Sequence, residues 1–370
     1  MRFLVVPLLA LSLAAAQGED LQSIFQKASQ SLSSGDLPSA ERGFQQVLES
    51  QPQNIGALGN LGVVYTRMGR ASDAVTVYQR ALKLAPADPM LHLNLGLAYL
   101  KQDDYSAAQP HFRKVVAANP NHRQARELLA ATQIYTGDVD AAVKELEVLK
   151  NSGDSGTLYF LAIGYLKEGN REKSQQTIAE LFRGVSAAQA SFLAGRAYYE
   201  STLFEEALSS LEKARQLDAG LPGIDRELGK VYVSLRRFDD AKKSLEQAVV
   251  HNPDDPEAQY FLGATLVQEG ASARGTELLE KSKAARPNFW GAYYYLGKAQ
   301  LEEGRAAEAA ALLEKAVDLK PDETGAWYLL ARAERRAGRV EQARRASERL
   351  KILETAKRKQ EKLGTMQKQP

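Results

Sequence analysis

A motif of about 34 residues recurs along nearly the whole chain and limits the possible folds more than any other feature. A small residue, the first small position, marks it ten times at intervals of 34, 34, 34, 32, 33, 34, 34, 34 and 34 residues. These positions are Ala28, Gly62, Gly96, Ala130, Ala162, Gly195, Gly229, Gly263, Gly297 and Ala331. A second small position follows twelve residues after each of them. Two interleaved series over ten units predict a repeat architecture.

Each unit has the pattern of two helices. Apolar residues keep helical spacing from Leu58 to Tyr65, Gly69 interrupts the pattern, and it resumes at Ala74. A proline such as Pro86 then ends the second helix, because proline lacks an N–H donor. Gly or Ala at the small positions lets the two helices approach closely. Since two helices cannot bury their apolar faces alone, the units are expected to stack.

The Leu-Gly…Tyr…Gly…Ala…Phe/Tyr…Ala…Pro pattern at this spacing resembles the tetratricopeptide repeat. The resemblance covers about residues 21–353. It implies an all-α fold, an α-solenoid whose stacked helix-turn-helix units form a right-handed superhelix with a concave groove. We expect this solenoid over residues 21–354, with units starting near residues 21, 55, 89, 123, 155, 188, 222, 256, 290 and 324.

The fourth, fifth and sixth units depart from the family pattern. Asp154 stands where proline is expected, two intervals are short, and residues 151–156 (NSGDSG) interrupt the array. This irregularity indicates either a more open joint in the superhelix or tolerated sequence drift, and we adopt drift as the interpretation.

The N-terminus has the order of a secretory signal. Met1 and Arg2 provide a positive start, residues 3–13 are apolar, and residues 14–16 are alanines suited to cleavage. Eleven apolar residues span only about half of a bilayer core of ~30 Å. We therefore expect a signal peptide over residues 1–16 and a periplasmic or secreted protein, with an uncleaved anchor as the alternative.

The charge of the chain is concentrated at its C-terminal end. The whole chain carries a net charge of only +2, which argues against nucleic acid as a partner. Residues 324–370 hold 13 Lys and Arg against 5 Glu. We expect a basic tail over residues 355–370, which acts either as a solvated helix end or in peripheral contact with an anionic surface.

No constellation of catalytic residues stands out. The absence of cysteine excludes disulfides, thiolate metal sites and a cysteine nucleophile. The four histidines show no spacing typical of a ligand pair, and the sequence has no GxSxG, P-loop or GxGxxG motif. We predict a non-enzymatic protein with no catalytic residues, no cofactor and no metal.

The resemblance also implies which residues face a ligand, because in this family the first helix of each unit lines the groove. Aromatic or cationic residues lie three residues before the first small position, and cations often lie one residue after it, on the same helix face. These candidate groove residues are Tyr159, Phe192, Arg196, Arg226, Lys230, Tyr260, Tyr294, Lys298, Tyr328 and Arg332. The alternative is that the rings fill the core between repeats.

Two asparagines complete the candidate peptide-binding groove. Asn60 and Asn94 lie two residues before the first small position in consecutive units. In a glycosyltransferase superhelix similar to this array, inward-facing asparagines hold a peptide backbone, since an amide can both donate and accept. Only two such residues occur here, so the alternative is that they merely occupy the helix surface.

The sequence thus predicts an exported, non-enzymatic scaffold that binds an extended peptide or partner protein in its groove. Groove cations favour a ligand that is acidic or has a free C-terminal carboxylate. One alternative is a structural subunit of an envelope secretion or polysaccharide-export assembly. A helical superhelix belonging to an enzyme is a third reading, for which the chain leaves no room for a catalytic domain.

Overall fold

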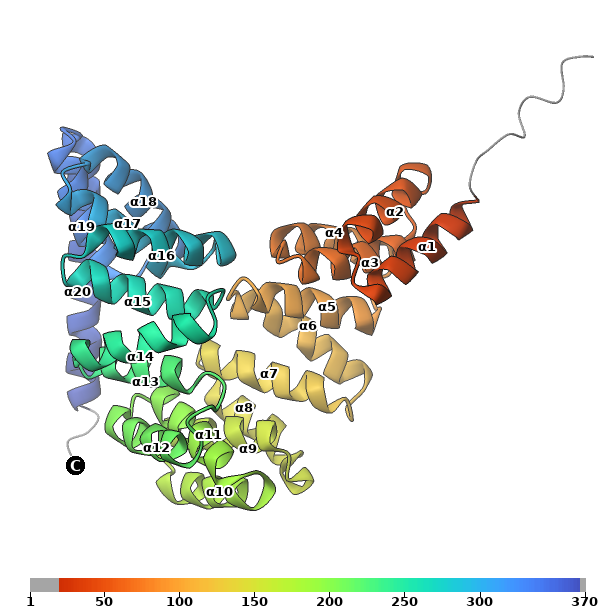
Figure 1. Ribbon diagram of the computed structural model, residues 1–370, viewed down its shortest axis with the longest axis horizontal. Helices are drawn as coiled ribbons and strands as arrows, with labels where there is room; N and C mark the ends of the chain where they lie inside the picture. Colours follow the sequence, from red (N-terminus) through yellow and green to blue (C-terminus); the bar gives the residue numbers. More distant parts are fainter. Residues whose placement is uncertain (1–19, 367–370) are drawn as a thin grey trace, which may run out of the picture. The chain divides into compact units, whose positions relative to one another are not determined.

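The computed structural model describes residues 20–366, and the expected signal peptide lies outside them (Figure 1). The described residues form twenty α-helices and one 3₁₀ helix, η1 (Lys150–Ser152), without a strand. The first helices of the ten repeats are α1 (Leu21–Ser34), α3 (Ile55–Arg67), α5 (Pro89–Leu100), α7 (Arg123–Thr136), α9 (Ser155–Lys167), α11 (Ala187–Glu200), α13 (Ile224–Ser234), α15 (Pro256–Gln268), α17 (Trp290–Glu302) and α19 (Thr324–Arg336). The second helices are α2 (Leu37–Ser50), α4 (Ala71–Leu84), α6 (Tyr105–Ala118), α8 (Val139–Glu147), α10 (Arg171–Gly184), α12 (Phe204–Leu217), α14 (Phe238–His251), α16 (Ser272–Ala285), α18 (Ala306–Leu319) and α20 (Val340–Met366).

The helices belong to two compact bodies whose boundary lies in α7. They are the N-terminal body (Met1–Ala125) and the C-terminal body (Arg126–Pro370). Each helix from α1 to α6 packs on the next in the first body, and each from α8 to α20 does so in the second. The predicted all-α solenoid is confirmed, and its first helices begin at or within two residues of the expected unit starts.

The small positions lie where the two helices of a repeat cross. A Cβ atom added to Gly229 would lie 2.4 Å from Cγ of Leu245 on the second helix, closer than real Cβ contacts. In the next repeat, a Cβ on Gly263 would lie 2.9 Å from the carbonyl oxygen of Gly275. The repeat therefore needs small residues because helix backbones and large side chains occupy the space that a side chain there would take.

The turn between the two helices of each repeat needs a left-handed backbone. One residue of this turn has positive φ in every repeat, and these turn residues follow the intervals of the small positions. They are Gly35, Gly69, Asp103, Gly137, Gly169, Thr202, Arg236, Gly270, Gly304 and Gly338. Glycine occupies seven of the ten turns, since only glycine adopts this conformation without steric cost.

The irregular middle repeats keep the helix-pair arrangement. Helix α8 is short, and η1 follows it within the segment that the sequence marks as an interruption. Asp154, which replaces the expected proline, caps α9 by accepting hydrogen bonds from the backbone N–H groups of Gly156 and Thr157. A capping carboxylate thus starts this helix without a proline.

The last helix continues past the expected end of the solenoid. Helix α20 runs to Met366, so the predicted basic tail begins inside a helix, and residues 367–370 lie outside the described part. From Glu354 to Lys359 every side chain is exposed. In the described part of the chain, no helix combines the length and apolarity needed to cross a membrane.

Candidate functional site

The first helices of the C-terminal body lie side by side, each from α9 to α19 in contact with the next first helix. Together they form a continuous surface, here called the first-helix surface. Its middle carries a group of charged side chains, here called the charged cluster, on α11, α13 and α15. The members of the charged cluster are Arg196, Glu200, Arg226, Glu227, Lys230, Asp255 and Glu257.

Glu227 is the centre of the charged cluster and is only 2% exposed. Lys230 Nζ lies 3.0 Å from Glu227 Oε2 and 3.0 Å from Glu257 Oε1, so it bridges α13 and α15. Arg196 Nε on α11 lies 3.9 Å from Glu227 Oε1. The buried carboxylate therefore ties three consecutive repeats together.

Arg226 makes a second set of ion pairs between the same repeats. Its guanidinium lies 2.9 Å from Glu227, 2.7 Å from Asp255 and 3.4 Å from Glu257. Asp255 also caps α15 by accepting from the N–H groups of Glu257 and Ala258. The carboxylate that caps the first helix of one repeat thus also forms an ion pair with an arginine of the preceding repeat.

The ion pairs control the protonation of the cluster. Burial acts to raise the pKa of Glu227, but Lys230, Arg196 and Arg226 outweigh it and hold that pKa below its usual value. Burial acts to lower the pKa of Lys230, but Glu227 and Glu257 raise it above the usual value. Both groups are therefore charged at neutral pH.

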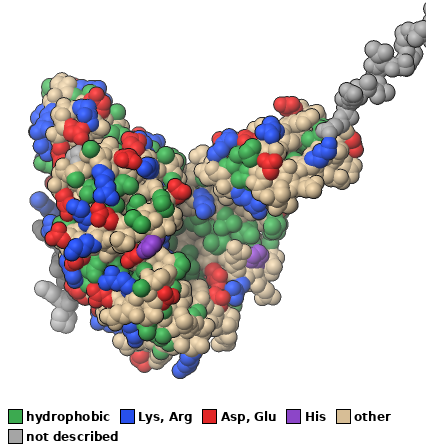
Figure 2. Space-filling model, viewed as in Figure 1, with side chains coloured by type: hydrophobic (Ala, Val, Ile, Leu, Met, Phe, Trp, Pro, Cys, Tyr) green, Lys and Arg blue, Asp and Glu red, His purple; other side chains and the backbone are tan. Residues whose placement is uncertain are grey.

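Glu200 differs from the other carboxylates of the cluster. Burial raises its pKa, and the charge of Lys230 only partly offsets this effect. Three cations thus face four carboxylates, so the cluster has no excess of positive charge. On the face seen in Figure 2, acidic and basic side chains are likewise interspersed over the C-terminal body.

Aromatic rings support the cations of the cluster. The guanidinium carbon of Arg196 lies 5.1 Å from the ring centre of Tyr159 and 5.8 Å from that of Phe192. Lys230 Nζ lies 4.9 Å from the ring centre of Tyr199. Cation–π contacts of this kind fix the direction of the charged groups.

The aromatic candidates pack between repeats, as the alternative interpretation of the sequence has it. Tyr159 and Phe192 are 5% and 7% exposed, and the ring of Tyr260 packs at 4.6 Å between centres against Phe289 of the next repeat. Tyr294 is half-buried. Tyr328 in the last repeat is the exception and is 57% exposed.

The remaining candidate cations lie towards the end of the first-helix surface. Lys298 is 3.8 Å from Glu302 on its own helix, a loose pair. Arg332 is exposed and makes no ion pair with any described residue. Of the five predicted cations, Arg226 and Lys230 are engaged within the charged cluster, whereas Lys298 and Arg332 are the more available to a ligand.

The two candidate asparagines belong to the N-terminal body. Asn60 lies on α3 and Asn94 on the neighbouring α5, and both are half-buried. Neither side-chain amide makes a hydrogen bond within the described residues. Their amides are therefore available to a ligand on these two helices.

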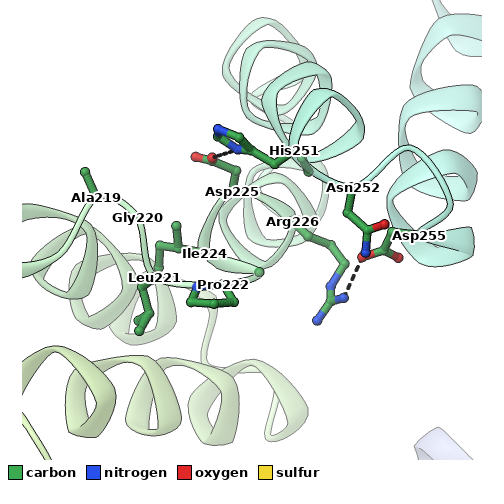
Figure 3. Close-up of a pocket in the computed structure, with 12 residues that line it drawn as sticks. Ala219, Gly220, Leu221, Pro222, Ile224, Asp225, Arg226, His251, Asn252 and Asp255 are labelled. Atoms are coloured by element: carbon green, nitrogen blue, oxygen red, sulfur yellow. Dashed lines mark hydrogen bonds and ion pairs between the residues drawn. The ribbon is translucent and has the colours of Figure 1, made fainter.

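A pocket of about 580 Å³, which the repeat pattern did not predict, opens beside the charged cluster (Figure 3). Helix α13 begins at Ile224, two residues later than the repeat pattern predicts, after Gly223 with φ of 81°. The loop before it forms one wall. On α13, Asp225 points towards His251 at 3.4 Å, whereas Arg226 points towards Asp255.

Two histidines of the N-terminal body meet although they are 19 residues apart. His92 on α5 and His111 on α6 place their Nδ1 atoms 2.9 Å apart, and His92 Nε2 donates to the carbonyl of Pro86. In neutral rings, His92 Nδ1 then accepts from His111 Nδ1–H. Burial lowers the pKa of His111 to about 4, and the charges of His92 and Lys114 act in the same direction.

Among residues 20–366, no group of three or more His, Asp or Glu side chains is arranged to hold a metal ion. The polar groups on the first-helix surface are ion pairs, rings and amides. Such groups can bind a polypeptide through hydrogen bonds and charge.

Known proteins share the repeat pattern. The chain matches a TPR repeat model over residues 64–103. One tetratricopeptide repeat model matches residues 99–156, 198–265 and 300–353, and a second matches residues 160–222 and 273–324. It is 24% identical to Protein CTR9 homolog of Arabidopsis thaliana over 48% of the chain. It is 28% identical to Anaphase-promoting complex subunit 3 of Schizosaccharomyces pombe over 35% of the chain.

A bacterial protein shows a similar partial match. Cellulose synthase 1 operon protein C of Komagataeibacter xylinus is 25% identical over 41% of the chain. The matches cover only 17%, 20% and 12% of these three relatives. Yeast Tom70 aligns in structure over 92% of this chain and 96% of its own, with 13% identity and a TM-score of 0.43. The three family matches, which follow one another from residue 64 to residue 353 with two short gaps, show that the chain is built of tetratricopeptide repeats.

Proposed function

We propose that this chain is an exported, non-enzymatic scaffold that binds an extended peptide or a partner protein on its first-helix surface. The observation that carries the proposal is the continuous row of first helices from α9 to α19. This row presents partly exposed charged groups, among them Arg196, Glu257 and Lys298. The name of the fission yeast relative describes a subunit of a complex, which supports a role in protein assembly.

The ligand that we propose is acidic or ends in a free carboxylate, and it binds towards the C-terminal end of the surface. Lys298 and Arg332 carry the preference, because Arg226 and Lys230 already pair with carboxylates. Salt screens the attraction between exposed charges, and the Debye length is ~8 Å in physiological buffer. An ion pair with an exposed cation therefore weakens as the salt concentration rises. The ligand should therefore bind more weakly as salt rises.

Matched acidic and basic peptides at two salt concentrations test this function. We expect the acidic peptide to bind better, and Lys298→Glu with Arg332→Glu to abolish the preference. Lys243→Glu on the second helix α14 is the control, since Lys243 is exposed and lies off the first-helix surface. Preference for the basic peptide, or indifference to the double substitution, contradicts the proposal.

Export is part of the proposal and has its own test. The order of charge, apolar run and alanines at residues 1–16 supports cleavage before Gln17. N-terminal sequencing of the protein from the cell envelope should give Gln17 as the first residue. Recovery of the chain from the cytosol with Met1 intact contradicts it.

The alternative is a structural subunit of an envelope secretion or polysaccharide-export assembly. The bacterial relative whose name places it in a cellulose synthase operon favours this reading. The basic end of the chain would then contact an anionic surface. Co-purification with an outer-membrane fraction, lost on removal of residues 355–370, would favour this alternative over binding of soluble peptides.

A further inference from the structure

One contact recurs at the joints between consecutive repeats. An aromatic ring on a first helix packs on a glycine at the start of the next first helix, 31 residues later. The pairs are Phe25 and Gly56, Phe192 and Gly223, Tyr260 and Gly291, and Tyr294 and Gly325. A Cβ added to the glycine would lie 3.3 Å from the ring of Phe25, 3.0 Å from that of Tyr260, 3.6 Å from that of Tyr294 and 3.9 Å from that of Phe192. The ring therefore leaves little space for a side chain at Gly56 and Gly291, and it makes ordinary van der Waals contact at Gly223 and Gly325.

At one joint an ion pair accompanies the ring and the glycine. Phe192 and Arg196 lie four residues apart on α11, and they face Gly223 and Glu227, which are four residues apart at the start of α13. Four residues is just over one helical turn, so Phe192 and Arg196 lie on one face of α11. Gly223 is the N-cap of α13, and Glu227 lies in the first turn of that helix. A helix with a glycine N-cap and a glutamate four residues later thus contacts a helix with an aromatic residue and an arginine four residues apart.

Helix α19 repeats this receiving pattern, and no further first helix follows it among residues 20–366. Tyr328 and Arg332 on α19 have the spacing and the repeat positions of Phe192 and Arg196. Tyr328 is 57% exposed where Phe192 is 7% exposed. Arg332 has no ion-pair partner among residues 20–366. The ring of Tyr328 and the guanidinium of Arg332 are therefore both exposed at this end of the array.

The neighbouring helix makes this end basic. Ala310 and Val317 on α18 are buried in the core that α18 shares with α19. The residues 34 positions later on α20 are Arg344 and Lys351, both exposed. A polar final helix suits the end of a solenoid, but it does not account for the exposed ring of Tyr328. Arg344 already pairs with Glu341 and Glu348 on its own helix, whereas Lys351 makes no ion pair with any described residue. Lys351, together with Arg332, favours an occupant with carboxylates.

We propose that this end of the array docks an acidic helix of a partner protein, in which a Gly-x-x-x-Glu segment faces Tyr328 and Arg332. The glycine lies on the ring, the glutamate pairs with Arg332, and a further carboxylate faces Lys351. The inference rests on the proposed function, since it assigns a helical partner to the C-terminal end of the first-helix surface.

A synthetic helix of about 20 residues, ~30 Å long, serves as the probe. It carries Gly-x-x-x-Glu and a further glutamate, and a fluorescent label reports its binding to the full chain. We expect a change of the peptide glycine to leucine, or of its glutamate to lysine, to weaken binding about tenfold. A proline-containing, extended peptide of the same charge should bind more weakly than the helix.

Substitutions in the chain give the matching side of the test. Tyr328→Ala and Arg332→Glu should each weaken the helical peptide about tenfold, whereas the control Lys243→Glu leaves its binding unchanged. Arg332→Glu should bind the peptide that carries lysine in place of glutamate.

Three results overturn the inference. If the extended acidic peptide binds as well as the helix, the helical partner is wrong while the proposed function stands. If no acidic peptide binds, both fail. If the chain associates with itself in sedimentation, and Tyr328→Ala abolishes this, the occupant is a second copy rather than an acidic partner helix.

Discussion

Single residues carry the constraints of the repeat at two kinds of position, the helix crossing and the turn. At the crossing, the neighbouring side chain or backbone leaves no space, as Leu245 does beside Gly229. At the turn the space is open, and only the sign of φ limits the choice, as at Gly69. A small residue at a crossing and a glycine at a turn therefore have different physical reasons, and substitutions distinguish them.

The turn positions without glycine should be sites of stabilisation. Thr202 is exposed and has φ of 60°, where a β-branched residue is strained. Thr202→Gly should raise the free energy of unfolding by about 0.5–1 kcal/mol, as relief of strain exceeds the entropic cost of glycine. Urea unfolding measures the change. Gly69→Thr should lower stability, and a gain there would contradict the argument.

A larger side chain at a crossing position should lower the free energy of unfolding. Gly229→Leu should cost about 1–3 kcal/mol, because its Cβ would lie 2.4 Å from Leu245. Gly59→Ala is the control in α3, since its Cβ would meet only Leu91, at an ordinary 3.4 Å. That control should be neutral or stabilising, as alanine favours helix. An unchanged denaturant midpoint for Gly229→Leu would show that the crossing is assigned wrongly.

Pairs of helices hold the polar groups that the sequence did not reveal. The repeat spacing predicted where helices begin, because small residues, caps and prolines act locally. It did not predict the partners of Arg226 and Lys230, which depend on how far consecutive first helices approach. The contact between His92 and His111 also depends on packing between helices. Their spacing of 19 residues was a usable signal, because Gln79 and Tyr99, 20 apart, also meet across two helices.

The histidine pair between α5 and α6 should make this part of the chain sensitive to acid. The pKa of His111 is about 4 in the folded chain, against about 6.5 in an unfolded one. Only the unfolded state takes up the proton between these values, so stability falls as pH drops from about 6.5 to 4. The protection of α5 and α6 against hydrogen exchange, relative to the intrinsic exchange rate at each pH, should fall over this range. His111→Gln should reduce this loss of protection, and an equal response would rule out His111 as its source.

The charged cluster should behave as a buried ion network of α11, α13 and α15. Glu227→Gln leaves Lys230 and Arg226 without their buried partner and should cost about 3 kcal/mol. Because the network is buried, the cost should change little with salt. Glu277→Gln, which removes an exposed pair with Lys281, is the control and should have little effect. A strongly salt-dependent loss for Glu227→Gln would place the network in solvent.

Within each body, consecutive repeats contact one another. The sequence predicted the repeat number and the all-α solenoid, since both follow from a period that persists over ten units. It did not predict the boundary between the two bodies in α7, or the late start of α13 that opens the pocket. These features arise where repeats depart from their own pattern, and one sequence does not show how packing accommodates a departure.

Damage to one repeat should therefore stay local. Gly229→Leu should accelerate hydrogen exchange in α12 to α15, which contact the altered repeat, while α1 to α6 keep their protection. Mass spectrometry of exchanged peptides measures both regions in one experiment. Uniform acceleration along the chain would show a single cooperative unit instead.

In the repeat of α17, the ring of one joint and the glycine of another lie on the same helix in opposite roles. Tyr294 packs on the glycine that follows it, while Gly291 of the same helix receives Tyr260 from the repeat before. Duplication of such a 34-residue segment in the gene would supply both halves of a new joint at once. The array could gain or lose a repeat without redesign of any other contact. The length of the array is thus set by the number of repeats, which duplication can change.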